Sequence, residues 1–554
     1  MAKQTVSEVL VDGLVAQGAR HVFGVVGDAL NPFTDAIRRH DDIDWIGTRH
    51  EEVAAFAAGA QAQLNGRLGV CAGTVGPGSI HLLNGLYDAA KSRAPVLAIC
   101  GQVPRHALGT NYFQEIDNDA LFRDVAVFNR TIVSAEQLPV LAELAIESAL
   151  GQRGVAVLTL PMDIASAEVP SGRPVRVFVD PSASRPGDDH LADAAQLING
   201  GGKVTLLVGI GAREARAEVM EMARVLSAPM VVTLKAKEVF DWDNPCQVGQ
   251  SGLLGNPAAA DALEGCDTLV MVGTDFPYAD FYPDGKHVVQ VDAVAHQLGR
   301  RTAVEVGLVG DARLTLQALL PRLQPIADTS HRDACRAVYD RWCGRQRRLA
   351  DPDFDRSLRG RVEAALGNPS HRIRPEAVAA ILDQLADDDA IFTTDTGMST
   401  VWLARFVSFR PGQRLLGSFN LGSMANAMPQ AIGAQAAEPG RQVIAFAGDG
   451  GFTMLLGDLL TAVAHDLPIK IVVFDNQRLG MVKLEQEQVG LPEFGTALRN
   501  PRPGRGRPGH GGDGHPHRGA SRSGGRPGPR PAHAGPRRRR RAHQPRRGGA
   551  PTPH

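Results

Sequence analysis

Two short polar motifs, each following an apolar run, constrain this sequence more than any other feature. Gly448-Asp449-Gly450-Gly451 follows the run at residues 443–447, and Asp475-Asn476 follows the run at residues 469–474. Both runs have the length and composition of strands, and a helical pattern at residues 452–465 separates them. Ligands of open α/β sheets bind outside the carboxyl ends of such strands. The pattern therefore predicts that both motifs meet at one edge of a parallel sheet.

The residue types in these motifs suit a magnesium-bound diphosphate. Asp449 and the amide of Asn476 offer hard oxygens, which Mg²⁺ combines with phosphate oxygens, and a backbone carbonyl near Arg478 would add a third ligand. The glycines let the backbone approach a diphosphate closely, and the N-terminus of a helix at 452–465 would point at the same anion. Gly-Asp-Gly alone is a common turn. Its pairing with the second motif makes the prediction specific.

Helical patterns alternate with short apolar strands along residues 1–500. This alternation is typical of parallel α/β sheets. A Pro-rich stretch at 171–189 and a polar, Arg-rich helical stretch at 330–366 interrupt it. We therefore predict an α/β fold of three consecutive doubly wound parallel-sheet domains, at residues 1–172, 190–325 and 373–500, of which the third is incomplete.

Composition restricts the class of protein. The 554 residues are 43% hydrophobic and 21% charged, as in globular proteins. The six cysteines show no C-x-x-C spacing, which argues against zinc and disulfides and fits a reducing compartment. The N-terminus reads as an amphipathic helix rather than a signal peptide, and no apolar stretch is long enough to span a bilayer. We expect a cytoplasmic protein, and any membrane contact would have to be peripheral, at the inner face of the membrane.

The last segment, residues 501–554, differs from everything before it. It contains no Leu, Ile, Val, Met or Phe, and from residue 502 it has 14 Arg and one Asp, so residues 1–501 carry a net charge of about −14. Such a composition cannot form a core, and we predict a disordered Pro/Gly/Arg-rich tail. One interpretation is a basic arm that binds nucleic acid or anionic lipid. The other, which we favour, is a shifted reading frame, because displacing the codons for Asp513 to Pro516 by one base can yield an apolar string.

Further candidates lie in the first and third domains. Glu51 opens an apolar helix, where it is either a cap that uses the helix dipole or a buried general acid/base. Gly73 to Gly78 could form a nucleotide loop, although Gly/Pro-rich turns are frequent. His81 on the next helix is more often hydrogen-bonded than catalytic. Met424, before a helix at 426–437, would by itself be core filling.

Taken together, longer segments carry a family resemblance. From residue 4 to about residue 500 the chain resembles thiamine-diphosphate enzymes of the pyruvate oxidase and acetolactate synthase family, in RHEEVAAFAAGAQAQL, GTVGPGSIHLLNGLYDA, NYFQE, DNPCQVGQSGLLG, TDFPYADFYP, GSMANAMPQAIGAQ, GDGGFTMLLGDLL and VVFDNQRLGMV. Within it the chain is most similar to the quinone-linked pyruvate dehydrogenases. The resemblance implies oxidative decarboxylation of pyruvate to acetate and CO₂ through a thiamine-bound enamine, with electrons passing through FAD to a quinone.

The resemblance also implies roles for single residues. Glu51 would hydrogen-bond the aminopyrimidine of thiamine diphosphate, Met424 would hold the coenzyme bent, and Phe113 and Gln114 would line the substrate pocket. The segment around the Mg²⁺-diphosphate site would comprise Gly422, Ser423, Asp449, Gly450, Gly451, Asn476, Gln477, Arg478, Leu479 and Gly480. The segments that contact FAD would comprise Ser251, Gly252, Leu253, Leu254, Thr274, Asp275, Phe276, Pro277, Tyr278 and Asp292.

Assembly is implied as well. In this family each thiamine site lies between the first domain of one subunit and the third domain of another, which implies a homo-oligomer built as a dimer of dimers. The family's lipid-activated docking to membrane quinone uses a C-terminal amphipathic segment. Residues 501–554 stand in its place here, so we do not expect that docking, and we expect no specific nucleic-acid partner.

Departures from the family pattern leave alternatives open. Met481 stands where the quinone-linked enzymes place a Phe near the active site, and Lys235 replaces an Arg near the flavin. The segment NQRLGMV is also typical of acetolactate synthases, in which a second keto acid is the acceptor. A third possibility is an oxidase that makes acetyl phosphate with oxygen and phosphate. An alternative of another class is a non-catalytic nucleic-acid-binding protein that acts through the basic tail.

Overall fold

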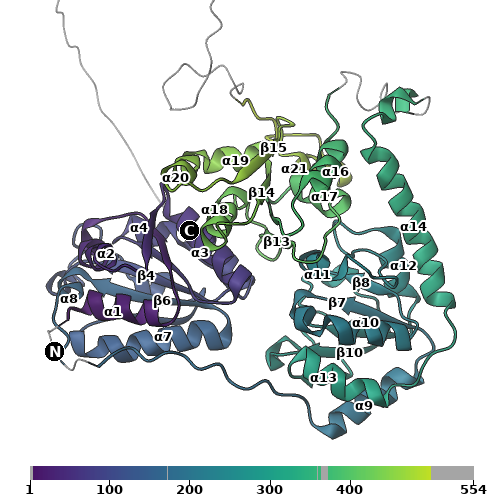
Figure 1. The fold of residues 1–554 in the computed structure, drawn as a ribbon, viewed down its shortest axis with the longest axis horizontal. Coiled ribbons are helices and arrows are strands. Elements are labelled where there is room, and N and C mark those ends of the chain that lie inside the picture. Colours follow the sequence, from purple (N-terminus) through teal and green to yellow (C-terminus); the bar gives the residue numbers. More distant parts are fainter. Residues whose placement is uncertain (1–3, 171–172, 358–359, 363–371, 501–554) are drawn as a thin grey trace, which may run out of the picture. The chain divides into compact units, whose positions relative to one another are not determined.

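The computed structural model describes residues 4–170, 173–357, 360–362 and 372–500. The described residues form three parallel sheets with helices packed around them (Figure 1). This confirms the predicted α/β class with three sheets in succession, whereas the domain boundaries stay predictions. The predicted basic tail, residues 501–554, lies outside the described residues. Within the described ranges, no helix is both long enough and apolar enough to cross a bilayer.

The first sheet has six strands in the order β2-β1-β3-β4-β6-β5, and all its pairs are parallel. No continuous apolar run marks β2 or β5 in the sequence, because both strands are only partly buried. The strands are β1 (His21–Gly24), β2 (Asp44–Gly47), β3 (Gly69–Gly73), β4 (Val96–Gln102), β5 (Ala126–Thr131) and β6 (Val155–Pro161). The helices are α1 (Val6–Ala16), α2 (Asn31–Arg38), α3 (Glu51–Asn65), α4 (Pro77–His81), α5 (Leu83–Lys91), α6 (Asn118–Leu121), α7 (Leu138–Gln152) and α8 (Met162–Ala165).

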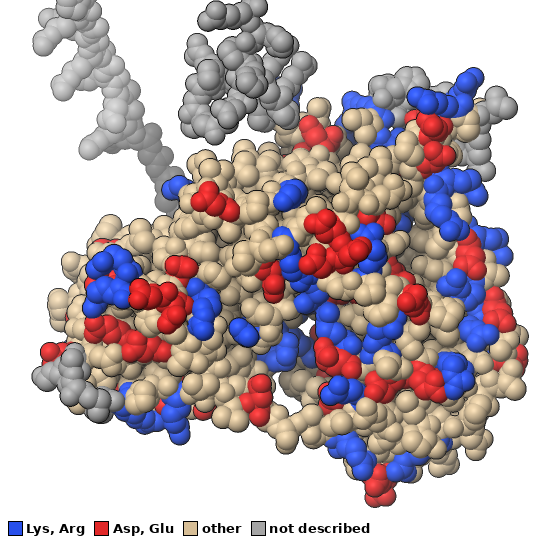
Figure 2. All heavy atoms as spheres, viewed as in Figure 1, with Lys and Arg blue, Asp and Glu red and all other residues tan. Residues whose placement is uncertain are grey.

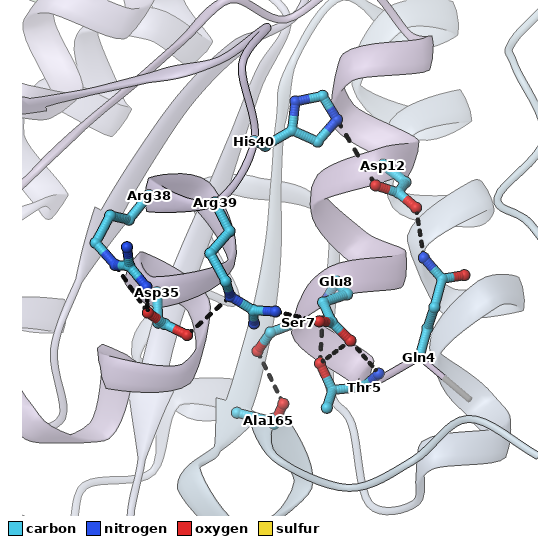
Figure 3. A network of polar contacts seen from close by, with 10 residues as sticks. All are labelled: Gln4, Thr5, Ser7, Glu8, Asp12, Asp35, Arg38, Arg39, His40 and Ala165. Atoms are coloured by element: carbon cyan, nitrogen blue, oxygen red, sulfur yellow. Dashed lines mark hydrogen bonds and ion pairs between the residues drawn. The ribbon is translucent and has the colours of Figure 1, made fainter. Parts of the chain in front are cut away.

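Polar contacts fix the start of α1 (Figure 3). Thr5 and Glu8 form a capping box, in which each side chain accepts from the other residue's backbone N–H. Arg39 Nη1 donates to Glu8 Oε1 at 2.6 Å, and Ser7 Oγ donates to the carbonyl of Ala165 at 2.8 Å. Such a cap satisfies helix N–H groups that would otherwise lack partners. These contacts attach α1 to α2 and α8.

The second sheet has five strands in the order β11-β10-β9-β7-β8. All of its ladder pairs are parallel, and β7 and β9 are buried along their whole length. The strands are β7 (Val204–Val208), β8 (Met230–Val232), β9 (Thr268–Val272), β10 (His287–Asp292) and β11 (Val306–Val309). The helices are α9 (Asp188–Gly200), α10 (Arg216–Val225), α11 (Lys237–Phe240), α12 (Pro257–Gly265) and α13 (Ala312–Leu319).

The Arg-rich helix α14 (Ser330–Ala350) ends earlier than the sequence pattern predicted. Asp351 is extended and Pro352 follows, and the residue before a proline is disfavoured in a helix. The predicted continuation to residue 366 was therefore wrong for the residues directly after Ala350.

Figure 2 shows Lys and Arg side chains interleaved with Asp and Glu on the visible face, so the described residues form no continuous basic patch there.

The third sheet has four strands in the order β13-β12-β14-β15, again all parallel. Gly448 pairs with Phe474, so the two polar motifs follow neighbouring strands at the same edge, as the sequence predicted. The strands are β12 (Ile391–Thr394), β13 (Arg414–Gly417), β14 (Val443–Gly448) and β15 (Lys470–Phe474). The helices are α16 (Pro375–Leu385), α17 (Met398–Phe406), α18 (Ala427–Ala437), α19 (Asp449–Met454), α20 (Leu459–Ala464) and α21 (Gly480–Gln488).

The helix predicted at 452–465 is interrupted. The structure has α19, a 3₁₀ turn at Leu456–Asp458 and then α20. Asp458 is buried at the break, where its Oδ1 accepts from Arg49 N at 2.7 Å and from Thr461 Oγ1 at 2.9 Å. The prediction was wrong because a tertiary contact with the first domain stabilises the break.

Helices α3 and α18 pack against each other and join the cores of the first and third domains. One cluster of buried side chains contains Ala54, Ala58, Met428 and Ile432. A Cβ on Gly433 would lie 2.6 Å from the Ala57 Cα, which shows how closely the backbones approach. Close packing of small residues therefore holds Glu51's helix against the helix that follows Met424.

Candidate functional site

A cavity of about 1160 Å³ opens at the carboxyl edge of the third sheet. Segments that follow β12, β13, β14 and β15 all contribute to its wall. Of the predicted residues, the lining contains Gly422, Met424, Asp449, Gly450, Gly451, Asn476, Gln477, Arg478, Leu479, Gly480 and Met481. Ser423 is outside the lining, and its Oγ accepts from Asn84 Nδ2 at 2.8 Å. The fold thus gathers nearly all the residues predicted for the diphosphate end into one cavity.

Asp449 is the most buried acid of this wall, with 4% of its surface exposed. Its Oδ2 accepts from Asn500 Nδ2 at 2.5 Å, and the same Nδ2 lies 3.1 Å from Asp475 Oδ1. Burial raises the pKa of Asp449; the Asn500 amide opposes this, and the negative charge of Asp475 adds to it. Two carboxylates therefore converge on one amide group. A cation at this position would relieve their repulsion.

The second motif forms a tight loop. Asn476 Oδ1 accepts from Arg478 N at 2.9 Å, and Gln477 has a positive φ of 57°. Leu479 N donates to Thr496 O and Leu498 N donates to Gln477 O, both at 2.8 Å. The amide oxygen of Asn476 thus keeps one lone pair for a ligand, while the loop is held by the strand-like segment at 496–498.

Asp395 is a buried acid of the site that sequence reasoning missed. It follows β12, and its Oδ1 accepts from Thr396 N at 3.2 Å and from Asn426 N at 3.1 Å. Burial raises the pKa of Asp395 to about 7. A Cβ on Gly451 would lie 2.6 Å from Asp395 Cγ, so this glycine makes room for the carboxylate. Asp-Thr-Gly at a strand end repeats the pattern of the Gly-Asp-Gly-Gly motif, and that repetition was a usable signal.

Met424 reaches the cavity from an unusual backbone. The residues on either side of the Ser423-Met424 pair, Gly422 and Ala425, have φ of 75° and 66°. A Cβ on Gly450 would lie 3.4 Å from Met424 Cε. The thioether therefore packs over the glycine motif and lines the cavity, rather than only filling the core.

Glu51 begins α3 and is 7% exposed. Its Oε2 lies 2.9 Å from His81 Nδ1, and His81 stacks on His50 with 4.5 Å between ring centroids. His50 caps the helix by accepting from Glu52 N at 3.2 Å. The carboxylate is thus both the first residue of the helix and the hydrogen-bond partner of an imidazole. The pairing with His81 was not predicted, because it joins residues 30 positions apart.

One chain does not gather every predicted residue. The lining of the large cavity comes from residues 372–485, and it includes neither Glu51 nor the substrate-pocket candidates. Phe113 is 79% exposed, and Gln114 has a positive φ of 64° in the same loop. The structure therefore leaves Glu51, Phe113 and Gln114 outside the cavity that contains Asp449.

A second, narrower cavity of about 170 Å³ lies at the carboxyl edge of the second sheet. Eight of the ten residues predicted for FAD contact line it, namely Ser251, Leu253, Leu254, Thr274, Asp275, Phe276, Pro277 and Tyr278. Gly252 and Asp292 do not. A Cβ on Gly252 would lie 3.0 Å from Phe276 Cζ, and Asp292 Oδ1 accepts from Val294 N at 2.9 Å and lies 3.7 Å from Arg93 Nη1.

The two cavities adjoin. Their walls share Thr396, Gly397, Gly422 and Met481. Gly397 and Gly422 both have positive φ, and a Cβ on either would meet no atom within 4 Å. A ligand in one cavity can therefore lie against a ligand in the other, separated only by small residues and one flexible thioether.

Comparison with protein families gives a match within each of the three α/β domains. Residues 4–121 match the N-terminal thiamine pyrophosphate (TPP) binding domain of thiamine pyrophosphate enzymes, residues 191–319 the central domain, and residues 395–505 the C-terminal TPP binding domain. The chain belongs to the thiamine pyrophosphate enzyme family. The large cavity lies in the C-terminal TPP binding domain, and Glu51 lies in the N-terminal one.

Individual relatives extend along most of this thiamine pyrophosphate enzyme. YdaP of Bacillus subtilis, whose name describes a thiamine pyrophosphate-containing protein, is 39% identical over 90% of this chain and 85% of its own length. Pyruvate oxidase of Lactiplantibacillus plantarum is 31% identical over 87% and 78%. The acetolactate synthase large subunit of Corynebacterium glutamicum is 31% identical over 87% and 76%.

The residues present fit the family's coenzyme. The paired carboxylates Asp449 and Asp475 lack a cationic partner among the described residues and suit a divalent ion. Gly397, Gly422 and Gly448 have open space where a side chain would stand, which leaves their backbone accessible to a diphosphate. The cavity wall can therefore hold thiamine diphosphate by its charged end.

Proposed function

We propose that this thiamine pyrophosphate enzyme is a flavin-linked pyruvate oxidoreductase, which converts pyruvate to acetate and CO₂ and passes two electrons through FAD to a quinone. The observation that supports this best is the wall shared by the two cavities, through Thr396, Gly397, Gly422 and Met481. Transfer of electrons between two cofactors requires that their reactive parts be close. A cavity that served only to stabilise the fold would have no need to adjoin the thiamine site.

The chain's own residues then have distinct tasks. Asp449, the Asn476 amide and the Arg478 carbonyl would hold Mg²⁺, and Met424 would set the coenzyme's conformation above Gly450. Thiamine diphosphate supplies, when bound, a nucleophilic carbon that adds to the keto group and stabilises the charge left by loss of CO₂. Every other task falls to side chains that bind, orient and move protons.

Glu51 is proposed as the proton-transfer residue. It is nearly buried, and the 2.9 Å contact with His81 provides a partner with which it can exchange a proton. Because the large cavity lacks Glu51, Phe113 and Gln114, we propose that a second copy of the chain supplies these residues, in a homodimer or a dimer of dimers. The exposed Phe113 would then be covered by the partner or by substrate.

Absorbance spectroscopy tests the proposal directly. The purified chain is loaded with thiamine diphosphate, Mg²⁺ and FAD and mixed anaerobically with pyruvate. We expect the flavin absorbance to bleach and acetate to form, with recovery of the spectrum on adding a soluble quinone. Glu51→Gln is the matched control: it should bind both cofactors and bleach roughly 10²-fold more slowly. A flavin spectrum that pyruvate leaves unchanged in the fully loaded protein would refute the oxidoreductase.

Acetolactate synthase is the second candidate. The support for it is the Corynebacterium glutamicum relative, as similar as the pyruvate oxidase, together with Met481 in the segment NQRLGMV. The same loaded protein should then consume pyruvate to give acetolactate, with no bleaching and no need for an electron acceptor. Formation of acetyl phosphate in the presence of oxygen and phosphate would instead identify the phosphate-dependent oxidase.

Residues 501–554 enter the proposal through their sequence alone. We propose that they result from a shifted reading frame, which the absence of Leu, Ile, Val, Met and Phe supports. Resequencing of the coding DNA and mass spectrometry of the C-terminal peptide would show whether the reading frame is shifted. If the segment is a nucleic-acid-binding arm instead, its deletion should abolish binding that weakens steeply with salt. The test with a soluble quinone does not depend on docking to a membrane.

A further inference from the structure

The cavity at the second sheet has a marked charge asymmetry. Its wall is formed largely by apolar and aromatic side chains, among them Leu253, Phe276 and Tyr278. Lys235 is the one cationic residue in the described lining, and Asp275 is the one acidic residue. A ligand in this cavity therefore meets a single ammonium group in a surrounding of low polarity.

The single acid of the wall is already paired. Asp275 Oδ2 accepts from Arg93 Nη2 at 3.3 Å, and Arg93 Nη1 also lies 3.7 Å from Asp292. One guanidinium from the first domain thus faces both carboxylates at this end of the second sheet. Asp292 is not part of the lining, so the one charged side chain of the described wall that has no ion-pair partner is Lys235.

Lys235 is held at the meeting point of all three domains. It lies in the 3₁₀ turn Leu234–Ala236 that follows β8. Its Nζ donates to the carbonyl of Ser92 in the first domain at 3.4 Å. Asp88, buried in the first domain, accepts from Gln430 Nε2 of the third domain at 3.1 Å and favours the charged form of Lys235. Within the part of the chain that the structure describes, Lys235 forms no ion pair and has no other hydrogen bond.

The ammonium group of Lys235 is therefore held in place, but not all of its hydrogen-bond donors are used. It has three N–H donors, of which one is engaged, and two remain for a ligand. Burial lowers the pKa of Lys235 to about 8, and the nearby Asp88 and Asp275 oppose this. The side chain therefore stays mostly charged at neutral pH while it faces an apolar cavity, where a charge acts more strongly than in water.

We propose that Lys235 is a positioning residue that stabilises the reduced, anionic form of a flavin in this cavity and so raises its reduction potential. This inference rests on the proposed function. Pyruvate and water give acetate, CO₂, two electrons and two protons; FAD takes up both electrons and one proton to become FADH⁻, and the second proton goes to solvent. Reduction thus adds one negative charge to the isoalloxazine, and a fixed cation beside it favours that state.

The orientation of the flavin follows from the wall shared with the large cavity. Lys235 and Met481 line the same small cavity, and Met481 also lines the large one. Only the isoalloxazine of FAD is redox-active, so that part must lie near the shared wall for electrons to pass. The ammonium is therefore near the ring system that gains charge.

Potentiometry of the FAD-loaded protein tests the inference. The midpoint potential of bound FAD is measured by dye equilibration in the wild type and in Lys235→Gln, Lys235→Arg and Lys203→Gln. Lys203 belongs to the same domain and is exposed, so it controls for the loss of a distant charge. Lys235→Met, which keeps the apolar stem, replaces the glutamine variant if that variant does not fold.

In Lys235→Gln we expect the equilibrium between reduced and oxidised FAD to shift about tenfold or more toward the oxidised form. For a two-electron couple this is a midpoint potential lower by about 30 mV. Lys235→Arg keeps the charge and should change the preference less than threefold, as should Lys203→Gln. An unchanged potential in Lys235→Gln, or in Lys235→Met where it replaces that variant, with FAD bound, would overturn the role of Lys235 alone. Failure of the wild type to bind FAD at all would instead overturn the proposed function.

Discussion

Substitution of Gly451 tests whether the glycine motif is needed to leave space for the Asp395 carboxylate. A methyl group on Gly451 would lie 2.6 Å from Asp395 Cγ and closer still to Oδ2, so Gly451→Ala must displace the carboxylate. Asp395 would then lose its hydrogen bonds from Thr396 N and Asn426 N. Hydrogen bonds to a charged group contribute about 1.5–3 kcal/mol each. Because burial raises the pKa of Asp395 to about 7, the carboxyl is partly protonated at neutral pH and the lower value applies.

Gly451→Ala should therefore lower the free energy of unfolding by about 3 kcal/mol, from the loss of two hydrogen bonds at about 1.5 kcal/mol each. For a compact unit that spans residues 1–500 the shift is about 1 °C per kcal/mol, which corresponds to a melting temperature lower by about 3 °C. Circular dichroism of the cofactor-free protein measures it. Gly457→Ala is the matched control, because Gly457 is exposed and a Cβ there meets nothing within 4 Å; it should shift the melting temperature by about 1 °C at most.

A double-mutant cycle isolates the clash. In an Asp395→Ala background the obstacle to the methyl group is absent, so Gly451→Ala should cost much less there than in the wild type. Equal losses in the two backgrounds would refute the reasoning, since the glycine would then be needed for something other than space for Asp395. A Gly451→Ala protein as stable as Gly457→Ala would refute it as well.

Two further predictions concern the metal site and the helix contact. Burial and Asp475 raise the pKa of Asp449, and Mg²⁺ must displace the proton from its carboxyl group, so the Mg²⁺ affinity measured by calorimetry should fall from pH 7 to pH 5. Asp475→Asn lowers the pKa of Asp449, so the fall should be less steep in this variant. An equally steep fall contradicts the assignment of Asp449 as a metal ligand. Gly433→Ala places a methyl group 2.6 Å from backbone atoms of Ala57 and should destabilise the protein by about 1–3 kcal/mol. Gly440→Ala has open space around it, and melting at the same temperature in these two variants would show that α3 and α18 can separate freely.

The parts of the site that could be predicted from the sequence are those that local patterns determine. Asp449 and Asp475 were placed together because each follows an apolar run, and parallel strands bring their carboxyl ends to one edge. Strand β14, predicted at residues 443–447, was found to within one residue of its observed bounds, because it is almost entirely buried and reads as a continuous apolar run. Strands β2 and β5 are not marked by such a run, because they are only partly buried.

Tertiary structure alone decided which distant residues meet. The break between α19 and α20 depends on Asp458 accepting from Arg49, the partner of Glu51 is His81, and Gly451 is required by Asp395. No periodicity or spacing encodes such pairs, because each joins segments whose separation along the chain is unrelated to their distance in space. The sequence by itself predicted a site for a cation and a diphosphate at the third sheet, and the fold brings most of the predicted residues together there. Only the packing of the second and third domains decided that this cavity adjoins a second one, because residues of both domains form the wall of that second cavity.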